Sequence, residues 1–300
     1  MRVALINCHP LTDPNHDEAP TVAAFGRAGH EAAPVAWNTE AGSDLSGFDA
    51  ALLRASWDYY AAPDRFLGWI DGAARQTLLL NPPQIIAWNY HKGYLALLDA
   101  AGVPIVPTVL CRAGERPDVI ATARDRGWDR GVVIKPAVGA GSWNVRRFDP
   151  GELARAQAFG EELGRERDIV IQPVAAGFAD PGERSLMWID GVWTHAIRKR
   201  PRYAGESESV VSDPPPTETE RDIGELALSL LPTRPLYARL DIVRGDPTTG
   251  GPGDATLVSE LELIEPSLFF FCDGGDDAAD ALVRATVRAA KARGGSRTSS

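Results

Sequence analysis

A lysine ends the apolar run of residues 132–135, and a loop with two glycines follows it directly. A lysine in such a position is costly to bury without a partner, whereas the backbone amides of a glycine loop can wrap a phosphate group. Lys135 precedes the glycines instead of following them, so the segment is not a P-loop. The pattern predicts a phosphate site formed by Lys135 and the loop residues Gly139, Ala140, Gly141 and Ser142. The alternative is an exposed lysine beside an ordinary turn.

Charged residues alternate on two later strand-like segments. Arg239 and Asp241 project from one face of the first segment, and Glu260 and Glu262 from one face of the second. If the two strands are neighbours, three carboxylates and a guanidinium share one surface. Carboxylate oxygens of this kind suit Mg²⁺, which takes a few carboxylates completed by substrate phosphates and water. The alternative is the solvated face of an antiparallel sheet.

A third candidate is the segment Gln172, Pro173 and Val174, which ends another strand. Because proline interrupts strand hydrogen bonding, we expect backbone groups here to be free to bind a ligand such as an adenine edge. Glu183 opens the next strand and could hold ribose hydroxyls. The alternative is a simple strand end.

Basic residues and a serine complete the candidate site. Lys199 and Arg202 are predicted to neutralise a phosphoryl group in transfer, unless they only form a solvated hairpin end. Arg54 ends a strand at the edge where open α/β sheets meet ligands, and its alternative role is a structural salt bridge. His9, which follows the first strand, and Ser267 are assigned to the same substrate pocket.

Strand and helix signals alternate over residues 1–90, which predicts a parallel sheet covered by helices. A small α+β lobe is expected over residues 91–174, with a strand at 103–109. A larger and mostly antiparallel lobe is expected over residues 175–293, and a disordered tail over residues 294–300.

Turn and cap signals mark the elements of the larger lobe. Asp190-Gly191 predicts a two-residue hairpin turn. Thr217 and Glu220 form a capping box at the start of a helix. The proline-rich residues 200–216 are expected to form a mobile loop.

Composition indicates an ordinary globular protein. The net charge of −10 and the lack of a basic stripe argue against nucleic acid as a partner. No apolar run approaches the roughly 20 residues of a membrane helix, and the N-terminus lacks the pattern of a signal peptide. The three cysteines are odd in number and widely spaced, which favours reduced thiols in a cytoplasm.

The order of these segments, from Lys92 to Glu262, resembles the ATP-grasp superfamily over roughly residues 85–272. The resemblance implies an α/β ATP-grasp fold of α+β lobes behind an N-terminal parallel-sheet domain. It also implies that Lys92, Lys135 and the glycine loop bind ATP phosphates, that residues 172–174 bind adenine and that Glu183 binds ribose. Asp241, Glu260 and Glu262 would hold Mg²⁺, in two ions or with Mn²⁺ as a substitute. This chain has Glu262 where the D-alanine ligase branch has Asn.

The whole chain is also similar to the O-ureido-serine cyclo-ligases of D-cycloserine biosynthesis. The similarity is carried by residues 7–10, by Arg54 with Trp57 and Asp58, and by residues 260–266. It implies that an acyl phosphate of O-ureido-D-serine forms and is closed by its own nitrogen, leaving ADP and phosphate. The ATP-grasp resemblance makes Arg239 the best candidate to hold the carboxylate or its tetrahedral oxyanion, with Lys199 as the second catalytic residue.

Three other functions remain open at this point. The chain could join two separate molecules, as glutathione synthetases and D-alanine ligases do. It could be an ATP-binding module without ligase activity, or a small-molecule kinase. In each case the expected partner is a small amino-acid-like molecule, and the sequence leaves open a homo-oligomer.

Overall fold

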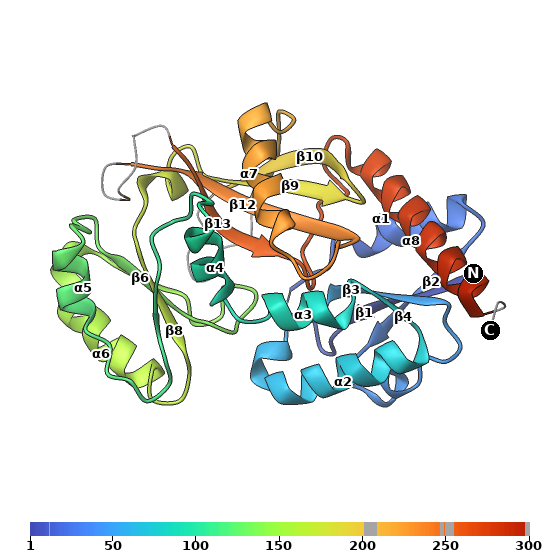
Figure 1. Cartoon of the computed structure of the whole chain (residues 1–300), viewed down its shortest axis with the longest axis horizontal. Coiled ribbons are helices and arrows are strands. Elements are labelled where there is room, and N and C mark those ends of the chain that lie inside the picture. The colour runs from blue at the N-terminus through green and yellow to red at the C-terminus, as the bar shows by residue number, and fades with distance from the viewer. Residues whose placement is uncertain (12, 201–208, 247–248, 250–254, 298–300) are drawn as a thin grey trace.

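The computed structural model describes residues 1–11, 13–200, 209–246, 249 and 255–297. Its strands form three sheets, and each sheet falls within one of the three ranges predicted as domains, although the domain limits themselves stay a prediction (Figure 1). Among the helices described, none combines the length and the apolar character that crossing a lipid bilayer requires.

The first sheet is parallel, as the alternation of strand and helix signals predicts. Its strands lie in the order β2-β1-β3-β4. Their bounds are β1 (Arg2–Asn7), β2 (Glu31–Ala36), β3 (Ala50–Ala55) and β4 (Leu78–Leu80). Helix α1 (Glu18–Arg27) packs on one face with a core that reaches the third sheet, and α2 (Pro63–Gln76) packs on the other. Gly29 has a φ of 74°, as is common just past the end of a helix, here α1.

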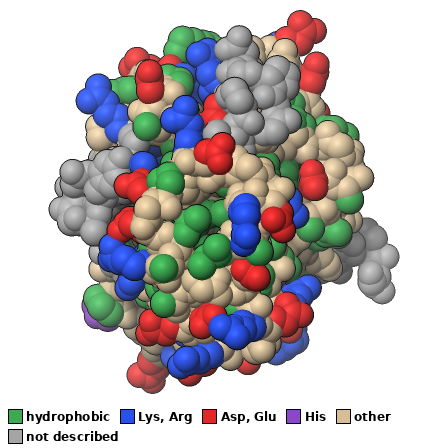
Figure 2. Space-filling model, turned by 90° about the vertical axis from the view of Figure 1, so that its left-hand side faces the viewer, with side chains coloured by type: hydrophobic (Ala, Val, Ile, Leu, Met, Phe, Trp, Pro, Cys, Tyr) green, Lys and Arg blue, Asp and Glu red, His purple; other side chains and the backbone are tan. Residues whose placement is uncertain are grey.

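The second sheet is antiparallel, in the order β5-β8-β6-β7. Its strands are β5 (Val109–Cys111), β6 (Val132–Pro136), β7 (Arg146–Phe148) and β8 (Ile169–Pro173). Helices α5 (Val119–Asp125) and α6 (Leu153–Leu163) cover it at the left of Figure 1. The space-filling view of this end shows acidic and basic side chains interspersed among apolar ones (Figure 2).

The third sheet is antiparallel and supplies most of the polar side chains discussed below. Its order is β11-β10-β9-β12-β13. The strands are β9 (Glu183–Ile189), β10 (Val192–Lys199), β11 (Val210–Asp213), β12 (Tyr237–Arg244) and β13 (Thr256–Glu262). The predicted hairpin turn is confirmed, because Asp190 and Gly191 both have positive φ values between β9 and β10.

Helices cover both faces of the third sheet. On one face lie α3 (Pro83–Asn89), α4 (Tyr94–Ala100) and α7 (Glu218–Ser229), and on the other lies α8 (Gly275–Arg297). The capping box at Thr217 and Glu220 is present at the start of α7. Helix α8 also contacts α1 and β4, so it packs between the first and third sheets (Figure 1).

Three sequence predictions need correction. Of the strand expected at 103–109, only an isolated bridge of Ile105 with Val258 and the first residue of β5, Val109, are present, because Pro104 and Pro107 cannot donate to a ladder. Residues 200–216 are not one loop, since β11 pairs with β10, while residues 201–208 lie outside the described part. Residues 294–297, predicted as the start of a disordered tail, belong to α8.

Asn81 joins the first sheet to the third. Its fully buried amide donates to the carbonyl oxygens of Tyr237 at 2.9 Å and of Leu263 at 2.8 Å, and its oxygen accepts from the backbone N–H of Leu236. Asn81 therefore holds the two sheets together.

We expect Asn81→Ala to lower the free energy of unfolding by at least about 2 kcal/mol, because each buried backbone group left without a partner costs about 1–3 kcal/mol. Urea unfolding followed by circular dichroism measures the change. Thr219→Ala, at an exposed position of α7, is the control and should stay within about 0.5 kcal/mol of the parent. A stability of Asn81→Ala equal to that of the control would contradict this role.

Candidate active site

A cleft of about 1740 Å³ lies between the second and third sheets and reaches the first. Most of the residues that the sequence analysis singled out line it, although their individual roles stay predictions. They are Lys92, Lys135, Gly139, Ala140, Gly141, Ser142, Gln172, Pro173, Val174, Glu183, Lys199, Arg239, Asp241, Glu260, Glu262 and Ser267.

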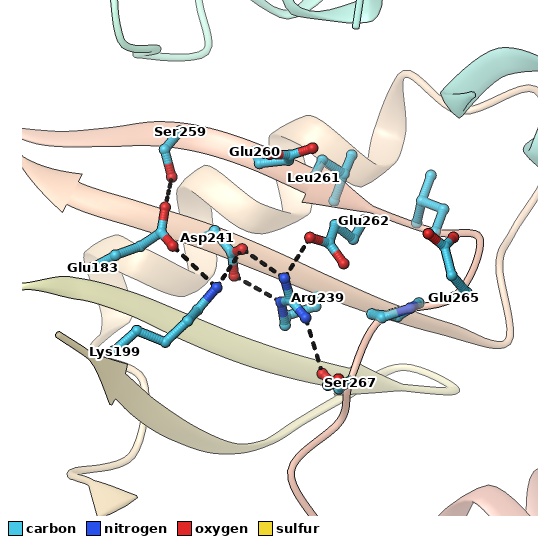
Figure 3. Close-up of polar contacts among 12 residues, drawn as sticks. Glu183, Lys199, Arg239, Asp241, Ser259, Glu260, Leu261, Glu262, Glu265 and Ser267 are labelled. Carbon is cyan, nitrogen blue, oxygen red and sulfur yellow. Dashed lines mark hydrogen bonds and ion pairs between the residues drawn. The ribbon is translucent and has the colours of Figure 1, made fainter. Parts of the chain in front are cut away.

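Strand pairing brings the alternating charged residues onto one surface. Strands β12 and β13 are antiparallel neighbours, with Arg239 opposite Glu262 and Asp241 opposite Glu260. Since side chains on a strand alternate between faces, all four project to the same side. Figure 3 shows them converging above β12 and β13. The neighbouring strands that the sequence analysis required are therefore present.

Arg239 is the centre of this surface. Its Nε and Nη2 atoms each lie 2.9 Å from a carboxylate oxygen of Asp241, and Nη2 also contacts Glu262. Its Nη1 donates to the backbone oxygen of Ser267 at 3.2 Å (Figure 3). Burial alone would raise the pKa of Asp241, but Arg239 and Lys199 hold it well below its usual range.

Lys92 and Lys135 meet the carboxylate of Glu260 from the opposite wall. The Nζ atom of Lys92 lies 2.6 Å from Glu260, and that of Lys135 lies 3.9 Å away. Burial lowers the pKa of Lys135, and Glu260 offsets this only in part. Lys92 lies closer to Glu260, so the carboxylate outweighs burial and raises the pKa of this lysine. Two lysine side chains are thus gathered beside the glycine loop.

Lys199 bridges two acidic residues of neighbouring strands. Its Nζ atom lies 3.0 Å from Glu183 and 2.9 Å from Asp241. Although burial and Arg239 act against it, Asp241 and Glu183 raise the pKa of Lys199. Glu183 also accepts a hydrogen bond of 2.7 Å from Ser259. Lys199 therefore belongs to the cleft and not to a solvated hairpin end.

Two carboxylates remain poorly compensated by the bases of the cleft. Burial raises the pKa of Glu262 to about 7. The negative charges of Asp241 and Glu260 also raise it, whereas Arg239 lowers it. Burial and Glu262 raise the pKa of Glu265 to about 8. The surface thus carries more negative charge than its lysines and arginine balance, so it can accept a further cation.

The predicted metal ligands are not preassembled. Across the described ranges, no three carboxylate, histidine or cysteine side chains converge as a ready metal site. Asp241 is held by Arg239 and Lys199, and Glu260 by Lys92. Their carboxylate oxygens are the type of ligand that Mg²⁺ prefers, and the excess negative charge of the surface favours a cation. A metal would have to replace the basic side chains as their partner.

The glycine loop is fixed by contacts with three other parts of the chain. Lys92 Nζ donates to the backbone oxygen of Gly139 at 3.2 Å. Trp143, at the end of the loop, stacks on Tyr60 with ring centroids 4.5 Å apart, and the Arg167 guanidinium lies 4.9 Å from the same indole. The loop is therefore held against the segment that follows β3.

The strand end at Gln172 differs from its prediction in one respect. The Val174 N–H donates to the backbone oxygen of Gly131 at 3.1 Å, so this donor is not free for a ligand. Gln172 donates to the Thr108 hydroxyl at 2.9 Å. Pro173 has no backbone N–H donor, as predicted, but the N–H of the next residue, Val174, is already bonded to Gly131.

Two of the predicted substrate residues, His9 and Arg54, do not line the cleft. His9 is exposed at the end of β1, outside it. Arg54 is only 2% exposed and donates to Pro266 O at 3.0 Å, with Asp17 at 3.3 Å. The structure favours the structural alternative for Arg54, because its buried guanidinium contacts Asp17 and a backbone carbonyl through Nη2, while Nε and Nη1 have no hydrogen-bond partner in the described part of the chain. Arg202 lies outside the described residues.

The sequence analysis assigned Ser267 to the pocket but gave no role to the other residues of the wall that follows β13. Asp17 accepts hydrogen bonds from the backbone N–H groups of Leu268, Phe269 and Phe270, and Trp57 Nε1 donates to Glu265 O at 3.3 Å. Trp57, Glu265 and Phe269 all line the cleft. The one available signal was an acidic residue set between the apolar residues 263–264 and Pro266.

Comparison with known proteins identifies the architecture. A family model described as the N-terminal domain of D-cycloserine synthetase DcsG matches residues 3–81. The chain is 30% identical over 278 residues to the cycloserine biosynthesis protein DcsG of Streptomyces lavendulae, covering 85% of this chain and 88% of that protein.

Solved structures agree with this similarity. The crystal structure of D-cycloserine synthetase DcsG matches with a TM-score of 0.84 and 25% identity, over 97% of this chain and 100% of that one. The ATP-grasp ligase PsnB, complexed with a precursor variant, Mg and ADP, matches with a TM-score of 0.62 and 18% identity, over 95% and 98%. The predicted ATP-grasp fold is confirmed.

The buried position of Arg54 leads to a prediction that needs no ligand. We expect Arg54→Met to lower the free energy of unfolding by about 3–5 kcal/mol, as removal of one partner of a buried ion pair does. Chemical unfolding measures it, and Arg75→Met, at an exposed position of α2, is the control. Unchanged stability together with a raised KM for the substrate would return Arg54 to a binding role.

Proposed function

Since the chain belongs to the DcsG family and is an ATP-grasp carbon–nitrogen ligase, we propose that it activates the carboxylate of O-ureido-D-serine as an acyl phosphate and closes the ring of D-cycloserine. The observation that carries this proposal is the meeting of Arg239, Lys92 and Lys135 with three carboxylates in one cleft. Phosphoryl transfer depends almost entirely on positioning and on charge of this kind.

Mg²⁺ fits the donor set of the cleft. Asp241, Glu260 and Glu262 would hold it, as one or two ions, and Mn²⁺ has the same preference for oxygen ligands. The poor compensation of Glu262 supports this assignment, since a cation would keep its carboxylate ionised. When bound, the metal would neutralise charge on the terminal phosphates of ATP.

The basic side chains would then act on the nucleotide. Lys92 and Lys135 lie beside the glycine loop and would exchange Glu260 for phosphate oxygens. The backbone N–H groups of the loop would hold the same phosphates. Glu183, on β9, would accept hydrogen bonds from ribose hydroxyls. This arrangement is the one that the ATP-grasp resemblance implies for these residues.

Arg239 would orient the substrate carboxylate. Its guanidinium is already fixed by Asp241 and by the Ser267 backbone, so little freedom is lost when it binds a second carboxylate. Lys199, fixed by Glu183 and Asp241, would stabilise charge on the phosphoryl group in transfer. Both residues stay in place through contacts that need no ligand.

Ring closure would follow within the same molecule. The nitrogen bonded to the side-chain oxygen attacks the acyl carbon, the carbon–phosphate oxygen bond breaks, and phosphate leaves. The carbamoyl group left on the ring nitrogen is then lost with water as ammonia and carbon dioxide. Well-oriented intramolecular attack gains about 7–11 kcal/mol over a free amine, so no second amino acid site is required.

The rival proposal is a ligase that joins two separate molecules, for which the cleft volume of about 1740 Å³ has room. The deciding experiment supplies the enzyme with ATP, Mg²⁺ and O-ureido-D-serine as the sole amino acid, and mass spectrometry detects cycloserine. A ring product supports cyclisation. ADP formation only after a separate amine is added would favour the rival, and no ATP turnover with any amino acid would favour a binding module.

The products of the nucleotide provide the next prediction. Because the lysines gather where terminal phosphates would lie, we expect ADP and phosphate in a ratio of one to one with the ring product. Anion-exchange chromatography of the reaction measures them. AMP and pyrophosphate would require attack at the α-phosphorus and would contradict the acyl phosphate.

Two substitutions should separate nucleotide binding from turnover. Lys135→Ala should weaken nucleotide binding, whereas Glu260→Gln should lower kcat by about 10²–10³, the size of about 2.7–4 kcal/mol lost from the barrier. Equilibrium binding of a fluorescent ATP analogue and steady-state kinetics measure the two effects. Glu162→Gln, an exposed residue of α6, is the control. Wild-type turnover of Glu260→Gln at limiting Mg²⁺ would disprove the metal assignment.

A further inference from the structure

Glu265 is a buried carboxylate for which the proposed chemistry has no use. It is 8% exposed and lines the cleft. Within the described residues, no lysine, arginine or histidine forms an ion pair with it, and no other residue donates a hydrogen bond to its carboxylate. Figure 3 shows it beyond Glu262 along the chain, without a dashed contact. We propose that Glu265 binds the free ammonium group of the substrate and restricts the enzyme to zwitterionic α-amino acids.

The backbone around Glu265 is fixed before a ligand arrives, so the point from which its side chain enters the cleft is set. Trp57 Nε1 donates to Glu265 O at 3.3 Å, and Arg54 donates to Pro266 O at 3.0 Å. Arg239 donates to Ser267 O at 3.2 Å. Three consecutive carbonyl oxygens are thus held by side chains from two different sheets. Preorganisation of this kind reduces the entropy lost on binding.

The contact between Arg239 and Ser267 also connects the two binding groups. The guanidinium that would hold the substrate carboxylate is joined to the segment that carries Glu265. A cation and a carboxylate are therefore presented together along one stretch of the cleft wall. The carboxylate and ammonium groups of an α-amino acid have the complementary charges.

The charges of the cleft favour an ammonium group at Glu265 over a protein base. Glu260 is balanced by Lys92, and Asp241 by Arg239 and Lys199. Burial and the neighbouring Glu262 raise the pKa of Glu265 to about 8, and the charges of Lys92 and Arg239 offset this only in part. An incoming ammonium group would supply further positive charge.

The proposal rests on the proposed function, so the experiment measures binding apart from turnover. Isothermal titration calorimetry is performed on the full chain with Mg²⁺ and a non-hydrolysable ATP analogue. The probes are O-ureido-D-serine and its N-acetyl derivative, and the variants are Glu265→Gln, Glu265→Asp and the control Glu162→Gln. ADP release with the same two compounds is measured in parallel.

We expect Glu265→Gln to raise the Kd of O-ureido-D-serine by about ten- to a hundredfold, the size of a hydrogen bond to a charged group. The N-acetyl derivative should bind the wild-type enzyme weakly. Its Kd should be the same in Glu265→Gln, because it has no ammonium group for the Glu265 carboxylate to bind. Glu265→Asp should recover part of the affinity, and the Kd of the nucleotide should stay within about twofold in every variant.

Equal affinity of wild type and Glu265→Gln for O-ureido-D-serine would overturn the proposal, as would failure of wild type to bind it. A loss of Mg²⁺ or nucleotide affinity in Glu265→Gln would also overturn it, because Glu265 would then serve the metal. Binding that depends on Glu265 but leads to no ADP release would support the ammonium site while contradicting the proposed ligase reaction.

Discussion

The charge balance between two walls of the cleft is the constraint on which the site depends. Carboxylates from β12 and β13 are buried beside one another, which is unfavourable unless each has a cation. Arg239 and Lys92 provide most of that compensation, while Glu262 and Glu265 remain with raised pKa values. The cleft is therefore stable as it stands, yet it retains a need for further positive charge. A magnesium nucleotide and an amino acid would supply it.

The rest of the fold positions these groups. Pairing of β9, β12 and β13 sets the spacing of the polar side chains on one face, while their apolar neighbours fill the core on the other. Asp17 and Arg54 fix the backbone after β13 from the first sheet, and Asn81 fixes the backbone at the start of β12. The N-terminal sheet thus contributes to the cleft mainly by holding its wall, and the wall carries Glu265.

Local patterns predicted much of this arrangement. The alternation at residues 239–241 and 260–262 placed the charged face correctly, and Asp190-Gly191 and Thr217 placed a turn and a helix start. The misses have a common cause in tertiary contacts. The burial of Arg54 depends on Asp17, and the Val174 donor is taken by Gly131. Glu265 lies beyond the end of β13 at Glu262, so strand periodicity does not predict the direction of its side chain.

The central claim is that ligands replace contacts now made between the cleft's own charges. A crystal structure of the full chain with a non-hydrolysable ATP analogue and Mg²⁺ tests it most directly. The account predicts that Lys92 Nζ leaves its 2.6 Å contact with Glu260 for phosphate oxygens, and that Glu260 turns to the metal. A nucleotide bound while the Lys92–Glu260 contact persists and the metal lies away from β12 and β13 would contradict it.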